Sequence, residues 1–437
     1  MISSAPPTAA ATTTLPAGVP PKLARIGGGF ILLLGALTAI GPFTIDLYLA
    51  AFPQITSDLD TQPAAVQLTI TATLAGLALG QLLIGSISDA VGRRRPLLAG
   101  LSLYIVASLG IVFVTSVEML TALRFLQGFA ASAGMVLSMA IVRDRFEGIQ
   151  VGKALARLML VVGVAPSIAP LIGAQFLLLG SWRYMFVALA GFGAILLALA
   201  FFLLKESLPV TLRRSGGVGA AARSYGSLLR DPVFMGLALL SGFSMAALFT
   251  YVSSATFVFQ QGFGLSAQQF AWIFASGAVA VTAGTQINGA MLGRVAPEQI
   301  LRWAVLAALV VTGSMVAVTA LQLGIWPLIV LLVSNLLVTG ILLPAVPVLA
   351  LEANAHRAGS AAALLGALQF GVGAAIAPVT GLFEEGSALA MAAVMFGATT
   401  VMVGLMIAVI PALRRSTKDA ARVLARSEEL VVSERVA

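Results

Sequence analysis

Two charged side chains lie inside long apolar segments of this sequence. Asp46 occurs in the segment from Gly28 to Ile55, and Arg124 occurs in a later one. A charge at the centre of a bilayer costs about 2.5–3.5 kcal/mol on insertion scales, so such residues usually serve proton relays or substrate sites. Asp46 is therefore the candidate group for taking up and releasing a proton, and Arg124 is the candidate for tuning that exchange.

The depths of these two residues allow them to act together. Asp46 lies about 14 Å from the outer end of its segment and Arg124 roughly 9 Å from the outer end of its own, at 1.5 Å of helix per residue. We expect the two side chains to meet or to share a water chain. The alternative is a buried pair with a purely structural role.

The composition excludes several classes of protein. Hydrophobic residues make up 59% of the 437 residues and charged residues only 10%, against about 25% charged in an average soluble domain. The apolar runs have the length of spanning helices, not of the short alternating strands of a barrel. The net charge is +8, but the basic residues lie in short loops between these runs. Basic residues in such loops set the orientation of a membrane protein, so we expect no nucleic-acid partner.

The sequence has few residues that could bind a metal or act as catalytic groups. The chain has no cysteine and a single histidine, His356, so we expect neither a disulfide, nor a metal site, nor a cofactor. A membrane-embedded enzyme needs convergent acids, histidines or a nucleophile at one depth, and no second acid lies within the spans. A sensor needs a soluble output domain, which we do not find. We therefore expect no enzyme.

The apolar segments predict an all-α polytopic membrane protein with twelve transmembrane helices. A basic, glycine-rich stretch separates the sixth span from the seventh and divides the helices into two six-helix bundles. The expected spans lie near 29–55, 64–88, 96–116, 119–142, 154–180, 184–204, 233–257, 268–291, 300–322, 325–350, 358–382 and 387–410.

The spans give the expected division of the chain. The N-terminal bundle occupies residues 28–204 and the C-terminal bundle residues 232–411, with a cytoplasmic linker at 205–231. Residues 1–27, rich in proline, alanine and threonine, are expected to form a disordered cytoplasmic tail, the alternative being a signal peptide. Residues 412–437 are expected to form a second cytoplasmic tail.

Lysine and arginine indicate the orientation. With the N-terminus inside, all but Arg124 and Arg183 of the 25 Lys and Arg residues fall in the tails, in the inner loops or at the inner ends of the spans. Short loops rich in these residues remain in the cytoplasm. We therefore expect both termini to be cytoplasmic.

The inner end of the second span carries a motif. Gly85, Asp89 and Gly92 precede Arg93 and Arg94 in a pattern that resembles the Gly-x-x-x-Asp-x-x-Gly-Arg-Arg signature of the major facilitator superfamily. The resemblance implies a charge cluster that latches the inner side of the N-terminal half in the outward-open state. The expected members of this inner gate are Gly85, Asp89, Gly92, Arg93, Arg143 and Asp144.

Two further motifs resemble those of particular members of this superfamily. Arg124, Gln127 and Gly128 are similar to the Arg-x-x-Gln-Gly signature of proton-linked facilitators. The fifth span holds two prolines between glycines and resembles the antiporter signature of exporters, the alternative being an ordinary kinked helix. The expected antiporter-helix residues are Gly163, Pro166, Pro170 and Gly173.

The first span carries a motif that resembles one particular group within this superfamily. Asp46, Tyr48, Leu49 and Pro53 fit the Asp-Met-Tyr-Leu-Pro-Ala-x-Pro pattern of Bcr/CflA drug-resistance transporters. That resemblance implies proton-coupled export of bicyclomycin, phenicols or other amphiphilic drugs across the bacterial cytoplasmic membrane. We expect a monomer in the lipid bilayer whose partners are a drug and protons. Proton-linked uptake or export of a metabolite by the same fold is the alternative.

Polar and aromatic residues within the spans are candidates for the wall of a substrate cavity. A large apolar pocket with few polar groups accepts varied ligands. The alternative for each such residue is packing or an interhelix hydrogen bond. The expected cavity residues are Tyr48, Gln127, Tyr251, Asn335 and Gln369.

Overall fold

The computed structural model describes residues 28–213, 217–352, 354, 357–383 and 386–411. Both expected tails and His356 lie outside these residues. Within the described chain, twelve helices are long and apolar enough to cross a membrane. The predicted spans are confirmed, with ends that differ from the expected ones by a few residues.

The helices follow one another with short connections. In chain order they are α1 (Gly28–Asp46), the 3-10 turn η1 (Leu49–Ala51), α2 (Phe52–Asp58), α3 (Pro63–Val91), α4 (Arg94–Val112), α5 (Val117–Arg145), α6 (Ile149–Leu177), α7 (Arg183–Leu203), η2 (Val210–Leu212), α8 (Gly217–Leu229), α9 (Pro232–Thr256), the π-helix η3 (Phe257–Gly262), α10 (Ala267–Met291), α11 (Pro297–Ala320), α12 (Ile325–Glu352), α13 (Ala358–Ile376), the 3-10 turn η5 (Ala377–Leu382) and a last helix at residues 388–411.

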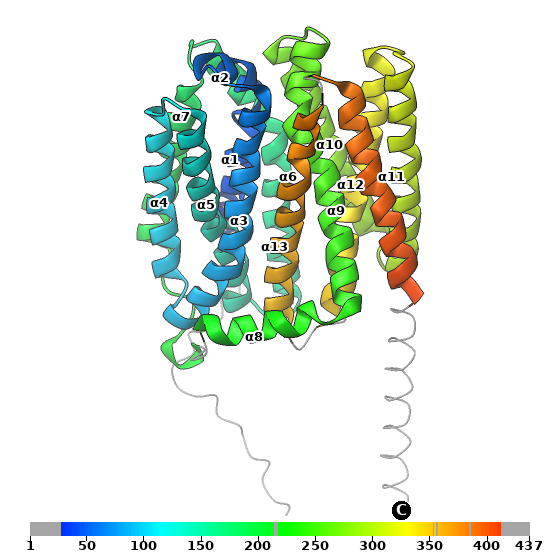
Figure 1. Cartoon of the computed structure of the whole chain (residues 1–437). Coiled ribbons are helices and arrows are strands. Elements are labelled where there is room, and N and C mark those ends of the chain that lie inside the picture. The colour runs from blue at the N-terminus through cyan, green and yellow to red at the C-terminus, as the bar shows by residue number, and fades with distance from the viewer. Residues whose placement is uncertain (1–27, 214–216, 353, 355–356, 384–385, 412–437) are drawn as a thin grey trace, which may run out of the picture.

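The helices form two six-helix bundles. In the N-terminal half, α3 packs on α5, α4 on α5 and α7, and α1 on α6; in the C-terminal half, α9 packs on α13, and α12 on α10 and α11. The two halves meet along α3 with α13 and along α6 with α10. The long helices run side by side, α2 lies at one end of them, and α8 lies across the opposite end (Figure 1). We call these the α2 end and the α8 end.

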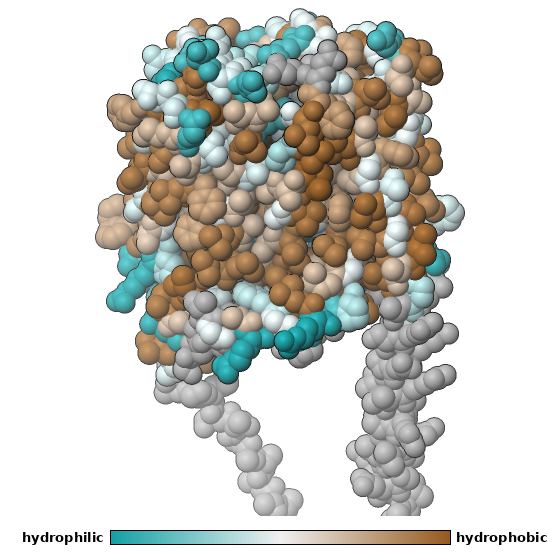
Figure 2. Space-filling view, in the orientation of Figure 1, coloured by the Kyte–Doolittle hydropathy of each residue, from teal (hydrophilic) through white to brown (hydrophobic). Residues whose placement is uncertain are grey.

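The outer surface fits a bilayer. Hydrophobic residues cover the middle of the visible face, and hydrophilic residues gather towards its two ends (Figure 2). Large apolar side chains such as Phe202, 79% exposed, and Trp303, 72% exposed, point outward from the spans. Lipid tails can cover such residues, so this distribution is that of a multi-pass membrane protein.

Glycines allow the closest helix contacts. A Cβ atom on Gly128 of α5 would collide with the main-chain oxygen of Thr73 of α3, and one on Gly76 of α3 with the oxygen of Phe125. Small residues of this kind bring helix backbones together within membranes. Gly128 is thus needed for the packing of α3 on α5, which holds α5 and its Arg124 in place.

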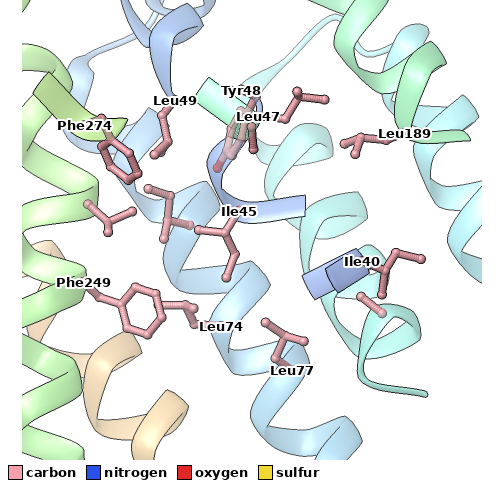
Figure 3. Packing of buried hydrophobic residues seen from close by; sticks show 14 of the residues in the cluster. Ile40, Ile45, Leu47, Tyr48, Leu49, Leu74, Leu77, Leu189, Phe249 and Phe274 are labelled. Carbon is pink, nitrogen blue, oxygen red and sulfur yellow. The ribbon is translucent and has the colours of Figure 1, made fainter. Parts of the chain in front are cut away.

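The first span is broken, which the sequence did not predict. α1 ends at Asp46, and the chain passes through η1 before α2 begins. Pro53 has no N–H, so the Leu49 oxygen lacks its usual helical donor. Instead, the Leu49 oxygen accepts a 3-10 hydrogen bond from the N–H of Phe52 and a second hydrogen bond from the hydroxyl of Thr256 on α9. In Figure 3, Leu49 lies beside Phe274 of α10 within one buried cluster. The break therefore faces the C-terminal half.

Candidate functional site

Asp46 is the last residue of α1 and lies at the break. The residue is only 6% exposed. This carboxyl group is therefore buried, beside apolar neighbours such as Ile45 and Leu47. Within the described residues, no cation or hydrogen-bond donor is bonded to its carboxyl group. The hydroxyl of Tyr251, on α9 of the other half, lies within range of its charge. Asp46 is thus a buried acid at the junction of the two bundles.

Arg124 binds the main chain next to Asp46, not the carboxyl group itself. It is fully buried, and it donates to Gln127 Oε1 at 2.5 Å and to the main-chain oxygen of Thr44 at 2.9 Å. That oxygen is one of the four that the end of a helix leaves without a partner. The guanidinium also lies over the ring of Tyr48, 4.1 Å from its centre. Within the described residues no direct bond joins Arg124 to Asp46, and through these contacts Arg124 holds the end of α1.

A polar network behind the break surrounds this arginine. Gln127 donates to Ser108 at 2.7 Å, and the hydroxyls of Thr44 and Tyr104 lie 2.8 Å apart. The hydroxyl of Tyr48 lies 2.9 Å from that of Thr69. Tyr104, Ser108 and Thr69 were missed in the sequence, where a hydroxyl in an apolar span carries no signal of its partner.

The five expected cavity residues are widely spread. Tyr48 and Gln127 are buried inside the N-terminal bundle, in the network just described. Asn335 is buried in α12, 1% exposed, and Gln369 of α13 donates to Ser241 of α9 at 2.6 Å. Tyr251, on α9, is the member of this set that lies within range of the charge of Asp46.

The helix with two prolines packs against the break. α6 runs unbroken through Pro166 and Pro170. Gly173 lies so close to the main-chain oxygen of Leu47 that a Cβ atom would overlap it. Earlier in the same helix, the main-chain oxygen of Gly163 accepts a hydrogen bond from Thr282 of α10 at 3.1 Å. α6 therefore contacts both the residue that follows Asp46 and the opposite half.

The halves are bonded to each other at the α2 end. Thr256 donates to the Leu49 oxygen at 3.0 Å, and Gln260 of η3 donates to the Ala50 oxygen at 3.1 Å. Nearby, Thr380 of η5 donates to Gln67 of α3 at 3.3 Å. A cavity of about 240 Å³ lies in this seam and is lined in part by Gln67 and Thr380. Thr256 and Gln260 were also missed, because the groups that bind them are main-chain atoms freed by the break.

A charge cluster lies at the α8 end of the N-terminal bundle. Arg93 contacts Asp89 at 2.5 Å and Asp144 at 3.1 Å. Burial lowers the pKa of Arg93, but these two carboxylates outweigh that effect and raise the pKa above its ordinary value. Ser207 also donates to Asp144, at 2.8 Å. The structure thus joins three of the expected gate residues.

Glu206 belongs to this cluster and was missed. Its carboxylate accepts hydrogen bonds from the backbone N–H groups of Arg93 and Arg94, at 2.7 and 3.2 Å, where α4 begins. Burial pushes the pKa of Glu206 up, but four backbone N–H donors outweigh it and hold the pKa below its ordinary value. Gly92 has a φ of +101°, and a Cβ atom there would lie 2.5 Å from this carboxylate.

The two remaining gate residues lie beside the cluster. Arg143 is exposed to solvent, and a Cβ atom on Gly85 would make an ordinary contact with Val136 of α5, at 3.6 Å. For metals, the described residues contain no group of three or more His, Cys, Asp or Glu side chains that could hold an ion.

The fold and the site together define a class of protein. Two bundles of six spans, with an acid buried where they meet, make a membrane transporter of the twelve-helix type. The model of the Major Facilitator Superfamily matches residues 32–378. The chain belongs to this family.

Relatives of known sequence and structure agree with this assignment. The chain is 40% identical over 366 residues to a protein of Bacillus subtilis named "Uncharacterized MFS-type transporter YdgK", a match that covers 83% of this chain and 91% of that protein. It is 33% identical over 346 residues to the "Bicyclomycin resistance protein homolog" of Haemophilus influenzae, covering 79% and 87%. Its fold is similar to that of a D-xylose-proton symporter, with a TM-score of 0.68 at 15% identity, over 86% of this chain and 97% of the other.

Proposed function

We propose that this protein is an antiporter that exports drugs or other amphiphilic small molecules in exchange for protons. The observation that carries the proposal is Asp46, a buried acid at the break of α1 that faces the opposite bundle with no cation bonded to it. Proton relays are a usual reason for retaining such an acid within a membrane. The name of the Haemophilus influenzae relative supports a drug as the substrate.

The orientation follows from charge. The α8 end carries the Arg93 cluster and the basic linker at 205–231, so we assign it to the cytoplasm. The α2 end then faces the outside, and the hydrogen bonds from Thr256 and Gln260 close the outer side. We propose that residues 28–204 and 232–411 move as two units, within a single chain that works as a monomer.

The proposed cycle depends on making and breaking the bonds between the break in the first span and α9. Drug enters from the cytoplasm or the inner leaflet and binds between the halves while the α2 end is closed. Opening of the α2 end breaks the bonds to Leu49 and Ala50, releases the drug, and gives Asp46 access to protons from outside. Arg124 keeps the end of α1 in place throughout, because it holds the Thr44 oxygen. The charge cluster at the α8 end closes the inner side in that state.

Replacement of the acid tests the proposal. Everted vesicles or proteoliposomes that carry the Asp46→Asn variant should lose drug accumulation driven by a proton gradient. The Glu118→Gln variant, which changes an exposed acid at the α2 end, should retain it. Full gradient-driven transport by Asp46→Asn would exclude this role for Asp46.

A second candidate is proton-linked uptake or export of a metabolite. Its support is the similarity in fold to a D-xylose-proton symporter. The same vesicles separate the two functions, because in a symporter substrate and proton move in the same direction. Alkalinisation of an acidic lumen when drug is added indicates exchange, and proton movement along with the substrate indicates symport.

A further inference from the structure

A buried hydroxyl without a partner lies on α9, within range of the charge of the acid at the break. Tyr251 of α9 is 2% exposed, and within the described residues its hydroxyl has no hydrogen-bond partner. Buried polar groups nearly always have a partner, and one without is expensive. The carboxyl group of Asp46 is likewise unbonded, and its charge reaches this hydroxyl. The two groups come from opposite bundles.

The position of Tyr251 is fixed by its neighbours. Its ring stacks on that of Phe274 at 5.3 Å and 18°. Gly277 of α10 lies beside the hydroxyl, at which a Cβ atom on this glycine would make an ordinary contact of 3.4 Å. Thr256, about five residues or roughly 7.5 Å further along the helix, bonds to the Leu49 oxygen. α9 therefore runs along the break, with Tyr251 one to two turns deeper than that bond.

The other ionisable groups near Asp46 already make hydrogen bonds, although Arg124 Nε has no partner in the described residues. Arg124 of α5 bonds to Gln127 and Thr44, Tyr104 of α4 to Thr44, and Tyr48 to Thr69 of α3. α10 carries no ionisable side chain, and the charged residues of α3, α6 and α7 lie towards the ends of those helices. Within the described residues, Tyr251 is thus an ionisable group of the opposite bundle whose donor has no partner beside the break.

We propose that Tyr251 is a positioning residue for proton coupling: while the α2 end is closed, its free hydroxyl turns to donate a hydrogen bond to the carboxylate of Asp46 once that carboxylate is charged. This inference rests on the proposed function. Hydrogen bonding to a charged form favours that form. The bond therefore promotes release of the proton from Asp46 while the site is open to the α8 end. When the α2 end opens, α9 moves away with the Tyr251 hydroxyl and the bond is lost. Asp46 then takes up a proton from the other side, which is the order that exchange for drug requires.

Infrared titration of the reconstituted protein measures this directly and needs no drug. The carboxyl band of Asp46 is the signal that wild type shows and Asp46→Asn lacks. In Tyr251→Phe, the pH at which half of this band is lost should rise by about one to two pH units, as expected for the loss of one hydrogen bond to a charged group. The ring and its stacking remain. Tyr184→Phe, at an exposed tyrosine, should leave the midpoint at its wild-type value.

The titration separates the two proposals. An Asp46 band that titrates at the same pH in wild type and Tyr251→Phe overturns the role of Tyr251 and leaves the role of Asp46 intact. If the wild-type band does not titrate over the accessible pH range, the proton site itself is wrong. A structural role for the hydroxyl would change thermal stability without moving the midpoint, so the melting temperature of each variant is measured alongside.

Discussion

Gly173 of α6 lies against the main-chain oxygen of Leu47, with no room for a side chain between them. Leu47 follows Asp46 directly, so this contact joins the helix with two prolines to the end of α1. Thr44, three residues before Leu47, is held from the other side by Arg124. The end of α1 is thus fixed by α5 and α6 while its outer continuation is bonded to α9.

A methyl group at this contact should displace α6 or the break. For Gly173→Ala we expect a loss of about 1–3 kcal/mol in stability, the usual cost of overpacking, together with a large loss of gradient-driven transport. Gly191→Ala is the matched control, because a Cβ atom at Gly191 of α7 meets nothing within 4 Å. Melting temperature and vesicle transport measure the two effects. Normal transport by Gly173→Ala would show that the close contact is not needed.

Replacement of Arg124 by lysine should not preserve function. The guanidinium bonds two acceptors at once, Gln127 and the Thr44 oxygen, and a lysine ammonium cannot copy that planar geometry. Loss of one charged hydrogen bond, worth about 1.5–3 kcal/mol, predicts transport roughly 10- to 100-fold slower. Arg302→Lys, at an exposed arginine of α11, should transport at the wild-type rate, and equal rates for both variants would contradict the role given to Arg124.

The charge cluster should make stability depend on pH through Glu206. Because the pKa of Glu206 is lower in the folded protein, its stabilising effect is complete above the unfolded value of about 4.3 and is lost as the pH falls through the folded value. Glu206→Gln should therefore melt at a lower temperature than wild type at pH 7, and the difference should shrink as the medium is acidified below that value. Glu118→Gln supplies the comparison. A difference that stays constant over this range would argue against the assigned hydrogen bonds.

The spans and the individual charges were predictable from sequence, but their partners were only partly so. Long apolar runs report helices directly, whereas the break after Asp46 depends on Pro53 together with a donor from α9, more than 200 residues away. Likewise, the depths of Arg124 and Asp46 suggested that they would meet or share a water chain, while in the folded chain the arginine bonds to the main-chain oxygen of Thr44. Glu206 was missed for the same reason, since it caps a helix 112 residues earlier in the chain.

The bonds from Thr256 and Gln260 should control access at the α2 end. The chain has no cysteine, so a single one can be introduced at Ala64, which lines the cavity in the seam between the halves. Removing the bond to the Leu49 oxygen with Thr256→Val weakens the closed arrangement by about 1 kcal/mol. An impermeant maleimide should then label Ala64→Cys several-fold faster than in the unaltered background. Thr319→Val, which removes a hydroxyl bonded only within α11, should leave the rate unchanged, and an equal rate in the Thr256→Val background would mean that this bond does not hold the α2 end closed.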